Sequence, residues 1–178
     1  MRKITLSLVA LFVFVNAFSQ GIEFEQGTFS QALAKAKKEN KVVFMDCYTT
    51  WCGPCKYLAK NVFTQKEVAD FFNKNFVNEK MDMESEEGKP LLKKFQVSAF
   101  PTLLWLDTNG NIQHKTPGAV DANSIIGTAT LALDKENSWS ALEEQGLKEN
   151  YGAIMAGSVV NTIVGANKPI MRLILAFQ

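Results

Sequence analysis

Cysteine and histidine are scarce in this chain, with three cysteines and one histidine among 178 residues. A structural zinc site usually takes its four ligands from two cysteine pairs or from a pair plus histidines, and this set is too small for either. The chain also lacks an excess of one charge: 19 basic and 18 acidic side chains give a net charge of +1. That balance, without a long block of either sign, argues against a nucleic-acid-binding protein. Hydrophobic residues at 47% and charged residues at 21% are typical of a globular protein.

The amino-terminal apolar stretch is too short for a membrane-spanning helix. It runs from Ile4 to Val15, follows the basic pair Arg2-Lys3 and precedes the small residues Ala17 and Ser19. This pattern predicts a signal peptide at residues 1–19, with cleavage before residue 20; an uncleaved anchor is the alternative. We therefore expect a secreted or periplasmic protein with no transmembrane span in the mature chain.

Two of the cysteines are separated by only two residues. The apolar run Val42–Met45 predicts a buried strand, and a short connector after it delivers Cys52 and Cys55 to the predicted start of a helix. The partial positive charge of a helix start favours a thiolate at Cys52. Pro54 suits a first helical turn, and Gly53 leaves room for another chain. Half of a zinc site and a static disulfide are alternatives, but so small a loop gains little stability from cross-linking, which favours redox turnover.

Hydrophobic periodicity and turn signals predict alternating helices and strands. The expected strands cover residues 42–47, 76–81, 103–106 and 113–116, the last two joined by a hairpin at Asn109-Gly110. The expected helices cover residues 29–39, 52–62, 90–95 and 124–133, with a further helix opened by a capping box of Thr64 and Glu67.

The segment Trp51-Cys52-Gly53-Pro54-Cys55-Lys56 resembles the active-site motif of the thioredoxin family. The resemblance covers roughly residues 22–134 and implies an α/β thioredoxin fold, a central mixed β-sheet flanked by helices, in a domain spanning residues 20–134. The helical segment 61–75 resembles secreted and membrane-tethered members, such as the periplasmic domain of the transmembrane disulfide reductase. No template covers residues 135–178, which we expect to form a carboxyl-terminal extension without assigned chemistry.

The resemblance also implies roles for residues outside the cysteine pair. Asp46, in an apolar strand, matches the buried acid that exchanges a proton with the resolving cysteine, and Lys80 matches the lysine near that acid. Pro101 matches a cis proline that faces the cysteines. Phe100, which is bulkier than the usual residue there, is expected to narrow the substrate groove.

Two further positions are expected to border this groove. Trp51 matches an apolar lid, and Gly118 a place where only backbone fits; ordinary packing is the alternative for both. The third cysteine, Cys47, should point to the opposite face of the strand from Asp46 as a buried, inert thiol. We expect His114, on the polar hairpin, to face solvent without a function.

These features predict a protein-disulfide reductase that works by dithiol–disulfide exchange at Cys52 and Cys55, with no cofactor and no metal. The expected partners are disulfide-bearing proteins and an upstream thiol reductant, either soluble or in the membrane, without nucleic acid. A redox-fold binding module and a dedicated electron relay to one client protein are the alternatives.

Overall fold

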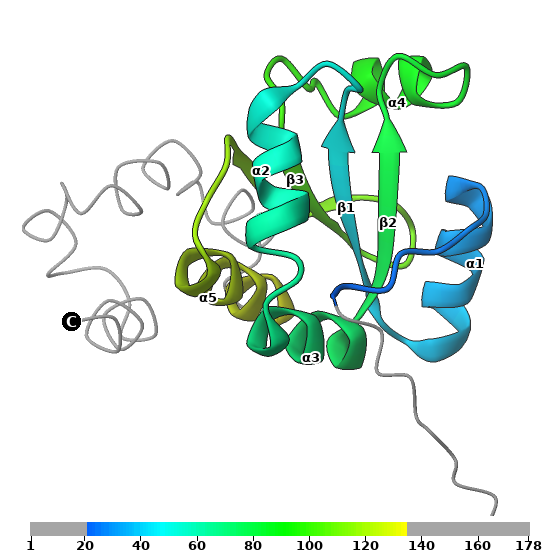
Figure 1. Cartoon of the computed structure of the whole chain (residues 1–178). Helices are drawn as coiled ribbons and strands as arrows, with labels where there is room; N and C mark the ends of the chain where they lie inside the picture. The colour runs from blue at the N-terminus through cyan, green and yellow to red at the C-terminus, as the bar shows by residue number, and fades with distance from the viewer. Residues whose placement is uncertain (1–20, 135–178) are drawn as a thin grey trace, which may run out of the picture.

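The computed structural model describes residues 21–134, which form one mixed sheet with helices on both faces (Figure 1). The strands are β1 (Val42–Tyr48), β2 (Phe76–Asp82), β3 (Thr102–Leu106) and β4 (Ile112–Pro117). The helices are α1 (Phe29–Glu39), α2 (Gly53–Asn61), α3 (Lys66–Asn75), α4 (Gly88–Lys94) and α5 (Ala122–Leu133). The predicted fold class is therefore confirmed. The signal peptide predicted at residues 1–19 and the extension at 135–178 lie outside the described residues.

The strands follow the order β2-β1-β3-β4 across the sheet, so β1 is a central strand. It pairs with β2 in parallel, through α2 and α3 as the crossover, and with β3 in antiparallel fashion. The predicted hairpin joins β3 to β4: Gly110 adopts a φ of 78°, and the Asp107 carboxylate accepts the N–H groups of Asn109 and Asn111. Because β1 is paired on both edges, the carboxyl end from which the cysteine connector leaves is held rigidly.

Alternation along β1 sends its side chains into two separate cores. Phe44 joins the core beneath α2, α3 and α5, which also contains Leu58, Phe72 and Trp105. Met45 joins the core beneath α1 and α4, together with residues such as Ala32 and Leu104. Figure 1 shows α2 and α5 on one side of the sheet and α1 on the other. Asp46 shares the face of Phe44, and this places its carboxylate on the side of the cysteine helix.

The start of α3 differs from the prediction. Gln65, not Thr64, is its N-cap residue, and no side chain caps the helix there. The Thr64 hydroxyl instead donates to the carbonyl of Lys60, 2.8 Å away, at the end of α2. The predicted capping box is therefore wrong, because the preceding helix takes the hydroxyl that the motif would need. The expected helical segment 61–75 is likewise divided, since α2 ends at Asn61 and α3 begins at Lys66.

A capping box does occur at the start of α1. The Thr28 hydroxyl accepts the N–H of Gln31, and the Gln31 side chain accepts the N–H of Thr28 in return. Between residues 21 and 134, no helix is both long enough and apolar enough to cross a membrane.

Candidate active site

Cys52 occupies the N-cap position of α2. Its backbone is extended, with φ −68° and ψ 110°, and its Sγ accepts the N–H of Cys55 at 3.1 Å. Gly53 and Pro54 form the first helical positions, where the missing N–H of proline costs no helical hydrogen bond. The orphan N–H groups and the dipole of a helix start stabilise negative charge at such a position. The geometry therefore favours a thiolate at Cys52 when the pair is reduced.

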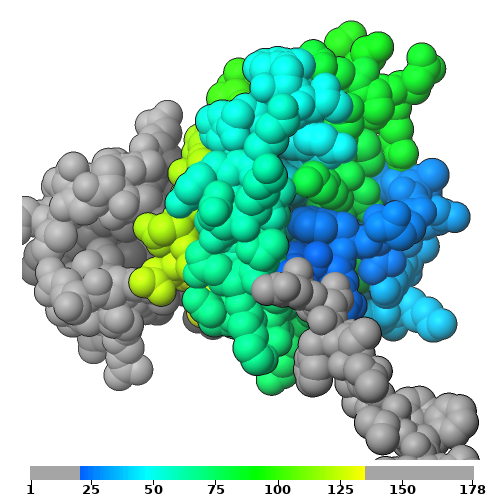
Figure 2. Space-filling model, viewed as in Figure 1, coloured from blue at the N-terminus to red at the C-terminus, as the bar shows by residue number. Residues whose placement is uncertain are grey.

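Cys52 and Cys55 form a disulfide, and both residues are buried, with 2% and 4% of their surfaces exposed. Trp51, Gly53 and Pro54 around them are exposed. These flanking residues, rather than the sulfur atoms, form the surface that another chain meets first. In Figure 2 the turn and helix that carry them form the cyan ridge across the visible face.

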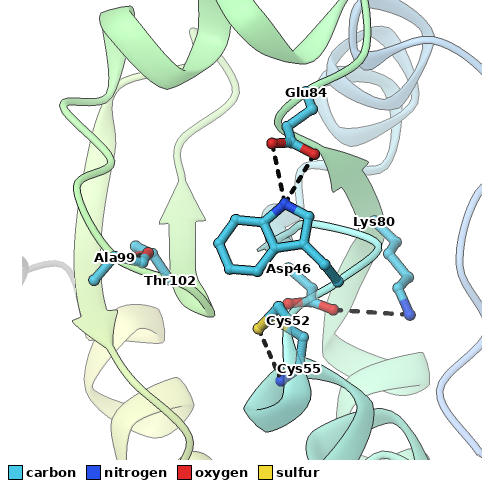
Figure 3. The surroundings of a disulfide bond; sticks show 8 residues. Asp46, Cys52, Cys55, Lys80, Glu84, Ala99 and Thr102 are labelled. Carbon is cyan, nitrogen blue, oxygen red and sulfur yellow. Dashed lines mark hydrogen bonds and ion pairs between the residues drawn. A yellow bond between two sulfur atoms is a disulfide. The ribbon is translucent and has the colours of Figure 1, made fainter.

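The exposed indole of Trp51 makes both a hydrogen-bonding contact and an aromatic contact within the site. Its N–H donates to both carboxylate oxygens of Glu84 at 3.0 Å, as Figure 3 shows. Its ring meets the ring of Phe100 edge-on, with the centroids 6.0 Å apart. Sequence reasoning missed Glu84. No local signal links two residues that are 33 positions apart.

The Phe100–Pro101 peptide bond is cis, as the resemblance implied. The Pro101 carbonyl accepts the N–H of Gly118 at 2.7 Å, and the Thr102 hydroxyl donates to the carbonyl of Ala99 at 2.7 Å. Gly118 has a φ of +89°, but a Cβ added there would meet nothing within 4 Å. The positive φ favours glycine at this position. The expectation that only backbone fits beside Gly118 in the substrate groove stays a prediction.

Asp46 is completely buried in the middle of this site. Desolvation raises its pKa from 3.8 to about 7, and the nearby Lys80 charge opposes part of that rise. Within residues 21–134, neither carboxylate oxygen forms a hydrogen bond. The Lys80 Nζ lies 4.0 Å from one of them, because Asp46 and Lys80 are direct partners across β1 and β2 (Figure 3). The predicted proximity of the lysine to the acid is thus confirmed.

Cys47 is the free cysteine, fully buried in the core beneath α1 and α4, on the opposite face from Asp46. Burial raises its pKa well above the ordinary thiol value, which keeps it protonated. Its predicted burial is confirmed. Across the described part of the chain, no group of three or more histidine, cysteine or acidic side chains is arranged to hold a metal ion.

His114 contradicts the prediction of a solvent-facing residue. It is 1% exposed and packs edge-on against the Trp105 ring, with the centroids 5.7 Å apart. The polar residues around it in the hairpin suggested a solvent-exposed strand, but α5 covers the face of β4 on which His114 lies. Burial lowers its pKa from 6.5 to about 4, so the ring is neutral at neutral pH.

A sequence model of the thioredoxin family matches residues 20–130. Thioredoxin Y from the chloroplast of Oryza sativa is 30% identical over 113 residues, which cover 64% of this chain and 64% of that protein. The thiol:disulfide interchange protein DsbD of Pseudomonas fluorescens is 29% identical over 98 residues, covering 53% of this chain and 17% of DsbD. The chain therefore spans less than two thirds of the length of these relatives.

Solved structures show the same fold. A solution structure from Bacteroides thetaiotaomicron, described as a candidate disulphide-isomerase, is 47% identical, with a TM-score of 0.60 over 66% of this chain and 97% of that one. A thioredoxin from Thermus thermophilus has a TM-score of 0.57 at 16% identity, over 66% of this chain and 90% of that one, and supports the fold alone.

Proposed function

The chain belongs to the thioredoxin family, and on this premise we propose that it is a thiol–disulfide oxidoreductase that reduces protein disulfides outside the cytoplasm. The observation that carries the proposal is the placement of the Cys52–Cys55 disulfide at the start of α2, above a buried carboxyl group whose pKa is raised to about 7. The cis Pro101 and the exposed Trp51 complete a surface suited to an extended substrate chain.

In the reducing direction the Cys52 thiolate attacks one sulfur of the substrate disulfide. The other substrate sulfur leaves as a thiolate, and a mixed disulfide joins Cys52 to the substrate. Cys55 then gives its proton to Asp46 and attacks the Cys52 sulfur, which releases the second substrate thiolate. The substrate gains two electrons, the protein is left with the Cys52–Cys55 disulfide, and protons from Asp46 and water restore the substrate thiols.

Asp46 suits the proton transfer because its pKa is close to neutral. A carboxylate with an ordinary pKa near 4 would be a much weaker base toward a thiol, and general bases act best when their pKa lies near the working pH. Its position on the α2 face of the sheet places the group under the helix that carries Cys55.

The proposed compartment rests on the signal-peptide pattern in residues 1–19 of the sequence. Disulfide-bearing proteins are the proposed substrates, and an upstream thiol reductant, soluble or in the membrane, is the proposed electron source. Nucleic acid has no part in the proposal.

Insulin reduction by the chain without residues 1–19 tests the proposal, with dithiothreitol as electron source. We expect turnover by the wild-type protein and none above background by Cys52→Ser. Equal rates for the two proteins would refute the enzyme and favour a redox-fold binding module. A Cys55→Ser variant should accumulate mixed disulfides with many proteins; capture of a single one would favour a dedicated electron relay.

Disulfide isomerisation is a second candidate, favoured by the description of the 47% identical structure. Recovery of activity from scrambled ribonuclease distinguishes it, because an isomerase needs Cys52 but can work after loss of Cys55. The reduction potential of the Cys52/Cys55 couple against glutathione then decides between reduction and oxidation. A potential near that of strong oxidants would contradict the proposed direction.

A further inference from the structure

The Lys80 ammonium lies against two aromatic faces as well as beside Asp46. Its Nζ is 4.8 Å from the centroid of the Tyr48 ring and 5.9 Å from that of Phe24. The same atom is 4.0 Å from an oxygen of Asp46. Tyr48 ends β1, Asp46 lies within β1, and Phe24 belongs to the segment that precedes α1. The ammonium therefore lies where two separate parts of the chain meet.

The Asp46 carboxylate alone is not enough to hold the Lys80 ammonium in this position. Asp46 is completely buried and cannot move toward water, whereas 31% of the Lys80 side chain is exposed. A lysine has four flexible side-chain bonds and a strongly hydrated charge, so water competes for the ammonium. At 4.0 Å, with no hydrogen bond to the carboxylate, the ion pair alone is a weak restraint. Ring faces attract a cation and exclude water from one side of it.

The Phe24 ring and the backbone of Tyr48 are each held by contacts that do not involve Lys80. The Phe24 ring packs against Phe63 at a centroid distance of 5.8 Å, and the neighbouring Glu25 N–H donates to the Asn78 carbonyl of β2. The Tyr48 carbonyl accepts the N–H of Met83 at 2.9 Å. The blue segment in Figure 2 that contains Phe24 lies beside the ridge formed by α2. The Phe24 ring, and the backbone that carries the Tyr48 ring, are therefore in place without the ammonium.

We propose that Phe24 and Tyr48 are positioning residues that hold the Lys80 ammonium beside the Asp46 carboxylate. The positioning itself concerns the resting, oxidised protein. Only its consequence for catalysis rests on the proposed function. Neither ring touches the cysteines in this role; each acts through Lys80.

The electrostatic consequence follows from the groups around Asp46. Lys80 is the charge that lowers the Asp46 pKa against the effect of burial. Burial, with smaller contributions from the charges of Asp82 and Asp46, raises the pKa of the Tyr48 hydroxyl, which leaves that hydroxyl neutral throughout the range in which Asp46 titrates. The disulfide carries no titrating group. If the rings are removed, water draws the ammonium outward and the Asp46 pKa rises.

The test is the titration of the Asp46 carboxyl carbon by ¹³C NMR in the oxidised protein. An opposite charge at this distance lowers a carboxyl pKa by about 1–3 units, so Lys80→Met should raise the Asp46 pKa by about 1 unit or more. Tyr48→Leu and Phe24→Leu should each raise it by a smaller amount, roughly 0.5 unit, and the double variant by more than either. Tyr48→Phe keeps the ring and should restore the wild-type titration. Phe71→Leu, which removes a ring that packs against Phe72 and Phe76 instead, is the matched control and should cause no shift.

A double-mutant cycle separates positioning from general loosening of the fold. In a Lys80→Met background, Tyr48→Leu should cause no further shift, because the charge that the ring holds is gone. An equal shift in both backgrounds, or no shift in any ring variant, would overturn the inference. If Phe24→Leu fails to fold, as thermal unfolding would reveal, the Tyr48→Leu cycle alone decides.

The same variants separate this inference from the proposed function. The titration involves no turnover, so an inactive wild-type protein would refute the proposed function and leave the positioning result intact. In an active protein, the ring deletions should move the lower-pH limb of the insulin-reduction profile upward in pH, as they move the Asp46 titration, because activity needs the deprotonated base. A shifted titration with an unshifted profile would restrict the role to the resting state and refute its catalytic part.

Discussion

Replacing Asp46 with asparagine should increase the stability of the oxidised protein above neutral pH and leave its stability nearly unchanged at acidic pH. The side chains have similar shapes, but only the aspartate can carry a charge at this fully buried position. Below about pH 4 the carboxyl group is protonated in both the folded and the unfolded chain. Between about pH 4 and pH 7 the unfolded chain releases the proton while the folded chain keeps it, so the wild-type protein loses stability as the pH rises.

The size of the effect follows from the pKa difference. A rise from 3.8 to about 7 corresponds to roughly 3 units, and at about 1.4 kcal/mol per unit the stability lost by pH 8 is at most about 4 kcal/mol. Relaxation around the charge and the nearby Lys80 reduce this, so we expect a gain of about 2–4 kcal/mol for Asp46→Asn at pH 8. Guanidinium unfolding of both oxidised proteins from pH 4 to pH 9 measures it. A difference that is constant with pH, or a less stable variant at pH 8, would refute the reasoning.

Glu79 offers a matched control for the catalytic part of the argument. It is also buried, desolvation raises its pKa to about 7, and it lies on β2 next to Lys80, so its side chain points to the α1 face of the sheet. Glu79→Gln should therefore also increase stability above pH 7 but leave insulin reduction unchanged. Asp46→Asn should increase stability and slow the attack of Cys55 on the mixed disulfide at Cys52. Slowing by both variants would show that loss of buried charge, rather than loss of the base, causes the defect.

Three further results are expected. As the pH falls from 6.5 to about 4, the wild-type protein should lose stability, because the unfolded chain binds a proton at His114 and the buried ring of the folded chain does not. His114→Leu should reduce this loss of stability. Unfolding of both proteins across this pH range measures the difference, and parallel curves would contradict the prediction. Phe100→Thr should lower the KM for insulin more than it changes kcat, because it removes the ring that packs against Trp51 and that we expect to narrow the substrate groove; an unchanged KM would assign Phe100 to packing. In the native oxidised protein Cys47 should not react with a thiol reagent, whereas one thiol should react after denaturation, and a reactive native thiol would show that the strand opens.

The sequence predicted the central strand and the cysteine helix because their signals are local. An apolar run, a turn and a Pro54 in the first turn are each visible within a few residues, and the structure places Cys52 at the N-cap as expected. The pairing of Asp46 with Lys80 was predictable only through the family resemblance, since it depends on the register between β1 and β2. Registers of parallel strands are set by the whole sheet, and no short pattern encodes them.

The errors share one physical origin, which is competition from distant parts of the chain. His114 is polar by sequence context but buried because α5 covers its face of β4. The Thr64 hydroxyl fits a capping motif but bonds to the helix before it. Glu84 and the ring of Phe24 reach the site from segments far from the cysteines, through contacts that leave no periodicity in the sequence. Patterns of neighbouring residues predict elements, whereas the contacts that tune the site arise only when those elements pack.

The two influences on Asp46 explain why the site needs both burial and a nearby cation. Burial without Lys80 would raise the pKa further, and the carboxyl group would then stay protonated at neutral pH and accept no proton from Cys55. Exposure to solvent would return the pKa toward 3.8 and leave a base too weak for the thiol. A base that works near pH 7 therefore requires the Lys80 ammonium at a fixed distance from the Asp46 carboxylate, close enough to lower its pKa but without a hydrogen bond to it. The rings of Tyr48 and Phe24 lie where they can set that distance. The burial of the carboxyl group is what costs the stability that Asp46→Asn should recover.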